Sequence, residues 1–135
     1  MRLTIVTPNQ RKLAADVEEV TLPGGLGEMT ILPGHTALLS TVEVGVVSFR
    51  QKEGGGRLAV NRGYVEVLDD AVTVLTHTAE SPNDIDCARA RRALERGRRR
   101  LAAAARDPGI DVVRAEYAVR RALARLAAAG EAAVQ

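Results

Sequence analysis

The residue pattern of the chain changes abruptly at Ser81–Asp84, and this change constrains the fold more than any other feature. Before it, short apolar runs alternate with glycine-rich and acidic turns, and nothing has the length and periodicity of a helix. After it, alanine, leucine and arginine dominate, and no proline occurs until Pro108. A chain of 135 residues has room for one domain with an appendage. We therefore expect a β domain over residues 1–81 and a helical region over residues 82–135.

The first region predicts an antiparallel β-sandwich or barrel. Many short strands at close spacing, with no helices between them, argue against alternating βαβ units. β-branched residues alternate on both sides of Asp69 and Asp70, which is typical of a hairpin, and residues 52–56 form a second expected turn. The expected strands cover residues 3–7, 17–22, 30–32, 44–50, 57–60, 64–68 and 72–76.

The second region predicts an antiparallel two-helix hairpin. Capping residues at 81–84 indicate the start of a first helix, residues 106–109 end it, and Asp111 is the expected cap of a second. Apolar residues recur at spacings of three and four in both helices, as in two helices that pack along a narrow seam. These seam residues are Cys87, Ala90, Leu94, Gly97, Leu101 and Ala104, then Val112, Ala115, Val119, Ala122, Leu126 and Ala129.

Most of the seam residues are small, so packing them removes little apolar surface from water. At about 25 cal/mol per Å² of buried apolar surface, we expect the hairpin to be marginally stable alone and able to open or swing. The alanine-rich stretch 127–134 is expected to fray.

Composition excludes several classes of site. The complete set of aromatic residues is Phe49, Tyr64 and Tyr117, too few to stack successive bases of a single-stranded nucleic acid, and the core must be aliphatic. The chain has one cysteine, Cys87, and two histidines. It can therefore form neither a disulfide framework nor a thiolate zinc site. No apolar run is long enough to span a bilayer and the N-terminus lacks a signal peptide, so we expect a cytosolic location.

Catalysis is not expected, because no acid–base pair stands out. Cys87 has no neighbouring base in the sequence and occupies a helical seam position. The glycines around Gly25 invite a phosphate-loop interpretation, but no lysine follows them as that motif requires. His35 lies in an expected loop and is interpreted as a surface contact rather than a metal ligand.

Charge is distributed unevenly between the two regions. Residues 1–80 hold 7 Lys and Arg against 10 Asp and Glu, whereas residues 81–135 hold 12 arginines against 7 acidic residues. Spacing alone leaves open whether these arginines bind an anion, such as a polyphosphate or an acidic protein surface, or form a solvated face. The arginines that rise in steps along the helices are Arg89, Arg92, Arg96, Arg99 and Arg100, then Arg114, Arg121 and Arg125.

Three blocks of sequence resemble the epsilon subunit of bacterial F-type ATP synthase. They are GEMTILPGHTALL at 27–39, GYVEV with VTVL at 63–67 and 72–75, and DIDCARA at 84–90. The first block is highly specific, and the likeness spans nearly the whole chain. The resemblance implies a β-sandwich that binds the gamma subunit and the c-subunit ring in the central stalk, a rotor part and not an enzyme.

The resemblance also gives expectations for contacts with the other subunits. The resemblance implies that Thr7 and Glu28 face the c-ring and that His35 and Ser40 lie toward gamma. It also implies a hairpin that extends into the catalytic head, meets acidic surface of the beta subunit beside alpha, and blocks ATP hydrolysis. The protein is then peripheral on the cytoplasmic face of the cell membrane, reaching the membrane only through the complex.

Some family members bind ATP in the folded hairpin through an I/L-D-x-x-R-A motif, which IDCARA at 85–90 matches. ATP is thus an expected regulatory ligand, while no cofactor and no metal are required. The implied ATP contacts are Glu80, Ile85, Asp86, Arg89, Ala90, Arg96, Arg121 and Arg125.

Three positions depart from the family pattern. Arg62 and Thr30 stand where glycine is usual, and Pro108 enters the turn of the hairpin.

Two other functions stay open beside that of a rotor subunit. They are a stand-alone ATP-sensing module and a nucleic-acid binder. The acidic, nearly ring-free residues 1–80 speak against nucleic acid.

Overall fold

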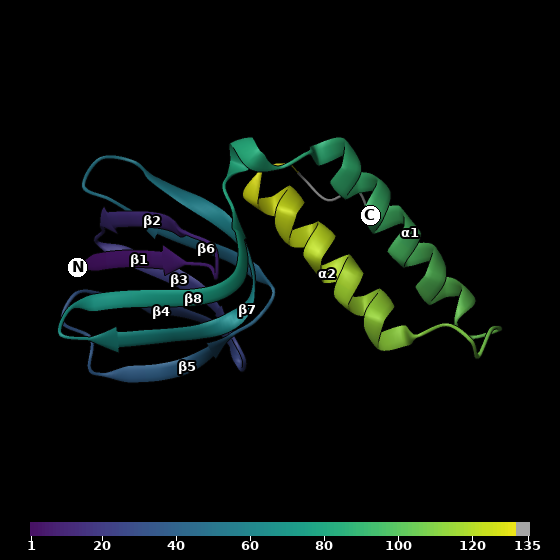
Figure 1. The fold of residues 1–135 in the computed structure, drawn as a ribbon, viewed down its shortest axis with the longest axis horizontal. Coiled ribbons are helices and arrows are strands. Elements are labelled where there is room, and N and C mark those ends of the chain that lie inside the picture. The colour runs from purple at the N-terminus through teal and green to yellow at the C-terminus, as the bar shows by residue number, and fades with distance from the viewer. Residues whose placement is uncertain (132–135) are drawn as a thin grey trace.

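The computed structural model describes residues 1–131 as a β-sandwich followed by two antiparallel helices (Figure 1). The expected fold class is confirmed. The remainder of the predicted hairpin region and of its fraying tail, residues 132–135, lies outside the described residues. The strands are β1 (Arg2–Val6), β2 (Arg11–Asp16), β3 (Glu19–Gly24), β4 (Gly27–Ile31), β5 (Leu38–Val42), β6 (Gly45–Arg50), β7 (Gly55–Leu68) and β8 (Ala71–Glu80).

Strand β7 joins the two layers of the sandwich. The first part of β7 pairs with β6 and the second part with β5. On its other edge, β7 pairs with nearly the whole length of β8. The eight strands follow the order β2-β1-β8-β7-β5-β3-β4, with β6 between β3 and β7. All pairs are antiparallel except β1 with β8, which run parallel. That pairing was not expected, because it joins the two ends of the sandwich sequence.

The sequence missed β2 and β5 and divided β7 in two. Neither missed strand shows a clear alternation, and Asn61 and Arg62 interrupt the apolar pattern of β7. The predicted hairpin at Asp69 and Asp70 is confirmed, with φ angles of 48° and 60° that fit a tight turn between antiparallel strands. The expected turn before β7 is confirmed as well, and Gly54 supplies its positive φ.

An aliphatic core fills the space between the layers, as the composition required. Inward-pointing residues of most strands are almost fully buried, whereas Phe49 is only partly buried against the core. The core cluster consists of Leu3, Ile5, Val17, Val20, Leu22, Ile31, Val42, Val47, Leu58, Val60, Val65, Val67, Val72, Val74 and Ala79.

The helices begin later than the sequence predicted. A short 3-10 turn (Pro82–Asp84) comes first, and α1 (Cys87–Ala103) starts only after Asp86, whose carboxylate accepts the backbone N–H of Arg89 at 3.0 Å. Helix α2 (Val112–Ala128) is capped in the same way by Asp111, as expected. Within the described part of the chain, no helix is long and apolar enough to span a membrane.

The helices pack along the predicted seam. Ala90 and Leu94 of α1 meet Ala122 and Leu126 of α2, and Gly97 lets the two backbones approach near Val119. Figure 1 shows α2 beside the sandwich and α1 on the far side of α2. The hairpin is therefore held on the sandwich chiefly through α2, which contacts β6 and β7.

Candidate functional site

The junction between the sandwich and α2 contains few apolar contacts. Ala59 of β7, Ile85 and Ala128 form a small buried cluster, with Val46 and Ala129 partly buried against it. Two of its three buried members are alanines, so docking the hairpin removes little apolar area from water. Polar contacts must therefore hold much of this junction together.

One group of polar contacts lies at the C-terminal end of α2. Arg125 Nη2 donates to Glu80 Oε2 at 2.8 Å, and the two side chains are only 23% and 25% exposed. Arg57 Nε donates to the backbone oxygen of Ala128, also at 2.8 Å. Arg125 Nε is buried without a hydrogen-bond partner in the described residues. The partial burial makes this ion pair stronger than a surface pair.

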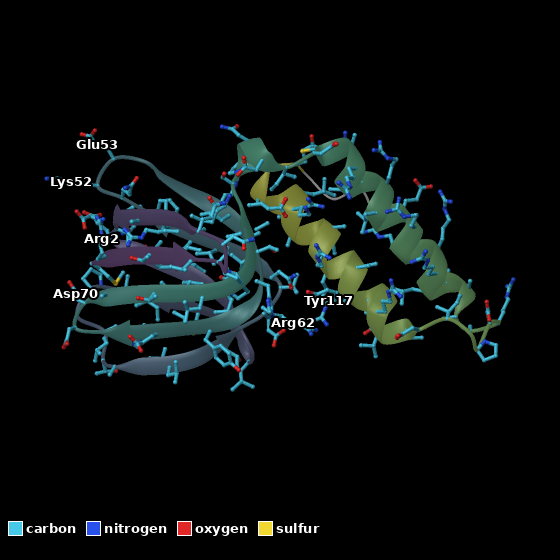
Figure 2. The ribbon with its side chains drawn as sticks, viewed as in Figure 1. Arg2, Lys52, Glu53, Arg62, Asp70 and Tyr117 are labelled. Carbon is cyan, nitrogen blue, oxygen red and sulfur yellow. The ribbon has the colours of Figure 1, made fainter. Side chains whose placement is uncertain are left out.

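A second group of polar contacts surrounds Tyr117, near the start of α2. The Tyr117 hydroxyl donates to Oδ1 of Asn61 in β7. The guanidinium of Arg62 lies over the same ring, 4.5 Å from its centroid, and that of Arg121 lies 5.8 Å away. Figure 2 shows Arg62 and Tyr117 where β7 meets α2. These are cation–π distances, so the ring joins sandwich and hairpin by two kinds of interaction.

The connection between β8 and α1 carries its own ion pair. Asp84 accepts the Ser81 hydroxyl at 2.7 Å and lies 3.6 Å from Lys12 of β2. The hydrogen bond from Ser81, followed by the charge of Lys12, lowers the pKa of Asp84 below its ordinary value. The ionised carboxylate thus helps to fix the direction in which the chain leaves the sandwich.

The structure brings together only part of the predicted nucleotide set. Glu80, Arg121 and Arg125 line a recess of about 10 Å³ beside Asn61, too small for a nucleotide without movement of the hairpin. In this structure Glu80 neutralises Arg125, so an incoming phosphate has to share or replace its carboxylate.

The other predicted nucleotide residues lie along the start of α1. Ile85 and Ala90 are buried in apolar clusters, and Asp86 serves as the helix cap. Arg89 and Arg96 are exposed and do not line the recess. Any nucleotide that contacts all of these residues must therefore lie across the two helices.

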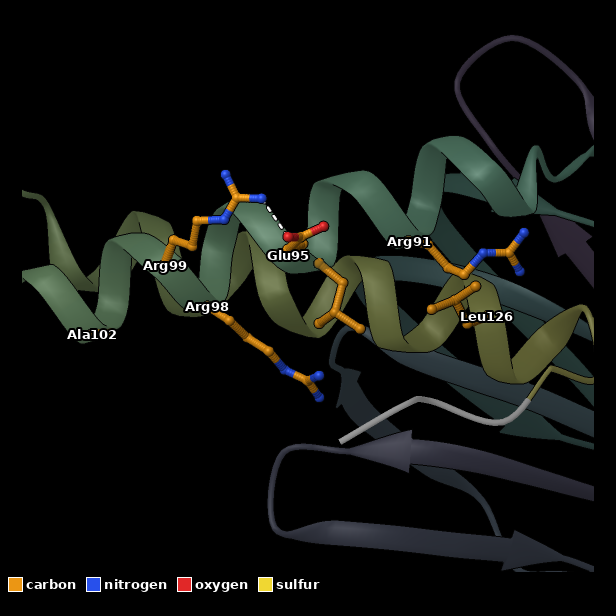
Figure 3. Close-up of a pocket in the computed structure, with 7 residues that line it drawn as sticks. Arg91, Glu95, Arg98, Arg99, Ala102 and Leu126 are labelled. Carbon is orange, nitrogen blue, oxygen red and sulfur yellow. Dashed lines mark hydrogen bonds and ion pairs between the residues drawn. The ribbon is translucent and has the colours of Figure 1, made fainter.

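A groove runs between the helices, away from the sandwich junction (Figure 3). Its volume is about 540 Å³, with Leu94 and Leu126 at the apolar base. Arg99 pairs with Glu95 at the rim, and Arg91 pairs with Glu131. Much of its charge is thus balanced within the chain, and none of the predicted nucleotide residues lines it.

The two predicted c-ring positions lie at the same end of the sheet. Thr7 directly follows β1. The last residue of β1 belongs to a row of paired residues that crosses β8 and β7 and ends at Thr41 of β5. The neighbouring Val42 pairs with Gly24, next to the turn before Glu28. Leu26 at the tip of this turn is fully exposed. The positions of Thr7 and Glu28 thus allow both to face one partner.

The two predicted gamma positions are separate. His35 is exposed in the loop after β4, and the neighbouring Gly34 N–H donates to Asp70 at 3.0 Å, which places the loop at the opposite end of the sheet from Glu28. Ser40 is half-buried on the face of β5 that it shares with the buried Val42.

Sequence reasoning missed an apolar surface on the outer face of β5, β7 and β8. Leu39, Tyr64 and Leu75 are 72%, 57% and 50% exposed, and Tyr64 pairs with Leu75. A hollow of about 380 Å³ adjoins them at the end of β1, lined partly by Val6 and Pro8. The sequence carries only a weak signal of this surface, because Leu75 is a single large apolar residue between Thr73 and His77 on the outer face of β8.

Cys87 shows no sign of reactivity. Burial is the main cause that raises the pKa of its thiol, and the nearby Glu131 carboxylate raises it further. Among residues 1–131, no cluster of three or more potential metal ligands is found.

Comparisons with known proteins agree with both regions of the structure. The family described as "ATP synthase, Delta/Epsilon chain, beta-sandwich domain" matches residues 1–82, and "ATP synthase, Delta/Epsilon chain, long alpha-helix domain" matches residues 83–130. The chain belongs to the ATP synthase epsilon-chain family. The two matches meet between residues 82 and 83.

Individual epsilon chains are similar over about three quarters of this protein. ATP synthase epsilon chain 2 of Syntrophotalea carbinolica is 48% identical over 101 residues, which cover 75% of this chain and 73% of that one. The epsilon chain of Geobacter metallireducens is 43% identical over 96 residues, 71% of this chain and 70% of that one. The suspected relation to bacterial epsilon subunits is confirmed.

Solved structures share the fold at lower identity. A chain in the Euglena gracilis mitochondrial ATP synthase superposes with a TM-score of 0.79 at 23% identity, covering 96% of this protein and 80% of that chain. A chain from the Tetrahymena thermophila mitochondrial ATP synthase central stalk and c-ring gives a TM-score of 0.54 at 17% identity, over 96% and 92%.

Proposed function

We propose that this epsilon-family chain is a non-catalytic subunit of the central stalk of a proton-translocating F-type ATP synthase. Its sandwich couples the catalytic head to the c-ring, and its hairpin inhibits ATP hydrolysis when it leaves the sandwich. The observation that carries the proposal is the junction, where a small apolar cluster and a few polar contacts hold the hairpin. Such a junction can open without unfolding the core.

The partners of the sandwich are the gamma subunit and the c-ring. The exposed apolar face with Leu39, Tyr64 and Leu75 supports a protein partner, because monomeric proteins rarely leave such surfaces open. We assign this outer face to gamma, together with the exposed loop of His35. Ser40 is kept as a second gamma position, although it lies on the opposite face of β5 from Leu39. Thr7 and Glu28, at one end of the sheet, are assigned to the polar loops of the c-ring. The subunit then lies peripherally at the cytoplasmic face of the membrane.

The arginines of α1 are assigned to acidic surface of the beta subunit, with alpha beside it, in the extended state. Arg89, Arg92 and Arg96 are all exposed, so the extended hairpin presents them without prior rearrangement. In the folded state, Arg121 and Arg125 are assigned to the phosphates of ATP, with Ile85, Asp86 and Ala90 at the start of α1. Because Glu80 holds Arg125, ATP binding requires that this pair adjust.

Reconstitution tests the coupling role. The chain is added to an ATP synthase preparation depleted of its own epsilon subunit, and binding, ATP hydrolysis and ATP-driven proton pumping are measured. We expect stable binding, restored pumping and lower hydrolysis. Stable ATP binding by the isolated chain without any binding to gamma would instead favour a stand-alone ATP-sensing module.

Calorimetric titration with ATP, and with ADP as comparator, tests the nucleotide assignment. Arg121→Ala and Arg125→Ala are each expected to weaken ATP binding by about 1.5–3 kcal/mol, the value of a charged hydrogen bond. Arg120→Ala is the matched control, since Arg120 is an exposed arginine of the same helix outside the recess. Unchanged ATP binding in both recess variants would contradict the nucleotide assignment but would not affect the proposed coupling role.

A further inference from the structure

Arg62 has a backbone conformation that its side chain does not favour. Its φ is 41°, in the left-handed region that residues other than glycine seldom adopt. It lies in the middle of β7, between Asn61 and Gly63, which pair with Thr78 and Thr76 of β8. No pair joins Arg62 to β8, so the ladder is interrupted at this residue.

The surroundings of Arg62 maintain this interruption. The buried hydroxyl of Thr76 lies 2.9 Å from the carbonyl oxygen of Asn61. The same hydroxyl accepts the backbone N–H of Asn61 at 3.1 Å. Gly63 then lets β7 approach β8 so closely that a Cβ atom there would lie 1.7 Å from the carbonyl oxygen of Leu75. The backbone at Arg62 is thus held by both of its neighbours.

The unusual conformation directs the Arg62 side chain toward α2. Its guanidinium lies over the ring of Tyr117, and Glu43 of the sandwich lies 3.9 Å from Arg62 Nε. Asn61, the preceding residue, accepts the hydroxyl of the same tyrosine. Two consecutive residues of β7 therefore hold one aromatic side chain of the hairpin, one through its ring and one through its hydroxyl.

We propose that Asn61, Arg62 and Tyr117 form a latch that keeps the helical hairpin folded on the sandwich. Strain at Arg62 places its guanidinium on the ring, and loss of the latch shifts the hairpin toward the open state. Its role in controlling inhibition rests on the proposed function, whereas docking of the hairpin is a property of the isolated chain. The same ring is also 5.8 Å from the guanidinium of Arg121, so a ligand that moves Arg121 acts beside the latch.

Thiol labelling measures hairpin opening in the full-length chain. With Cys87→Ala removing the native thiol, Ala59→Cys places a single thiol beneath the hairpin, where Ala59 is 4% exposed and contacts the cluster of Ala128. Its rate of alkylation reports how often the hairpin leaves the sandwich. Urea unfolding of each variant, measured in parallel, gives the contribution of global unfolding to that rate.

The latch predicts faster labelling when either of its contacts is removed. Tyr117→Phe keeps the ring but loses the hydroxyl, and labelling is expected to rise about fivefold, the effect of one net hydrogen bond. Arg62→Gly removes the guanidinium and relieves the left-handed strain. It is expected to speed labelling about fivefold while the urea midpoint stays unchanged or rises. Arg120→Ala, the matched control on α2, should leave both values unchanged.

A double-mutant cycle separates the latch from a general loss of stability. Tyr117→Leu removes the ring but keeps an apolar side chain, and in this background Arg62→Gly should no longer speed labelling. The latch is overturned if Arg62→Gly leaves the labelling rate unchanged in the Tyr117 protein, or speeds it equally in both backgrounds. The labelling and unfolding measurements use the isolated chain without ATP synthase. A result against the latch is therefore distinct from a failed reconstitution or an absence of ATP binding.

Discussion

The sandwich and the helical hairpin bury very different side chains. Of the twelve largest fully buried side chains among the described residues, all but Leu126 belong to the sandwich. The hairpin instead packs through alanine, one glycine and a few leucines, and it meets the sandwich mainly through polar contacts. Buried apolar area is the main source of stability, so the two regions should differ in how easily they open.

One short chain can therefore contain both a rigid and a movable part. The strands of the sandwich are joined by pairs distant in sequence, such as β1 with β8, and cannot separate singly. The hairpin has local contacts within itself and a small junction with β6 and β7. Similar changes made in the sandwich and in the hairpin should therefore have unequal effects on stability.

The largest effect is expected from Gly63→Ala in the sandwich. The added Cβ would meet backbone atoms of Leu75 and Thr76, at 1.7–2.9 Å, which cannot move without breaking the pairing of β7 and β8. We expect the free energy of unfolding, measured in urea, to fall by about 3 kcal/mol or more. Gly25→Ala is the control, because its added Cβ meets only the hydroxyl of Thr41, which can rotate.

Glu80→Gln should have the next largest effect, at the junction. It leaves the partly buried guanidinium of Arg125 without its carboxylate, and we expect the free energy of unfolding to fall by about 1–3 kcal/mol. Glu18→Gln is the matched change in the sandwich, where Glu18 pairs with the exposed Arg50 and should contribute nothing measurable. Equal losses of stability in the two variants would mean that the junction pair is no stronger than a surface pair.

Gly97→Ala should have a smaller effect, within the hairpin. The added Cβ would lie 2.7 Å from a methyl of Val119, forcing the helices apart, although alanine favours the helix by about 1 kcal/mol over glycine. Because these effects oppose each other, we expect a net loss of about 1 kcal/mol in urea unfolding. Adding Val119→Ala should restore part of the loss, since it removes the clashing methyl; no recovery would mean that the glycine serves another purpose.

The smallest effect is expected from pH at the connection between the two regions. The pKa of Asp84 is lowered in the folded chain, so its contribution is present at neutral pH and is lost as the pH falls through the folded pKa. Asp84→Asn should therefore be slightly less stable than the parent at neutral pH and equal to it in acid. Unfolding measured across this range checks the sign, and a difference that grows toward acid would contradict it.

Much of the fold was predictable because it depends on local patterns. Alternation identified most strands, the seam spacing identified both helices, and Asp111 was correctly predicted as a cap. The strands β2 and β5 were missed because neither alternates clearly. The start of α1 was placed too early because several residues near Pro82 can cap a helix, and only the packing of Ile85 against Ala59 and Ala128 decides among them.

The candidate site was less predictable than the fold. Glu80 and Arg125 were named as parts of one site through a family resemblance, and the structure places them in an ion pair. The Tyr117 contact was not foreseen, because its hydrogen-bond partner Asn61 lies 56 residues earlier in the chain. No pattern of spacing within either region indicates such a pair.

The two-part division, the aliphatic core and the thin seam of the hairpin could all be inferred from the residue pattern alone. These features follow from residue type and periodicity, which act over a few neighbouring positions. Tertiary packing was needed to specify the parallel pairing of β1 with β8, the left-handed φ of Arg62 and its contact with Tyr117. Each depends on which distant segments meet, because the packing of whole layers outweighs local backbone preference.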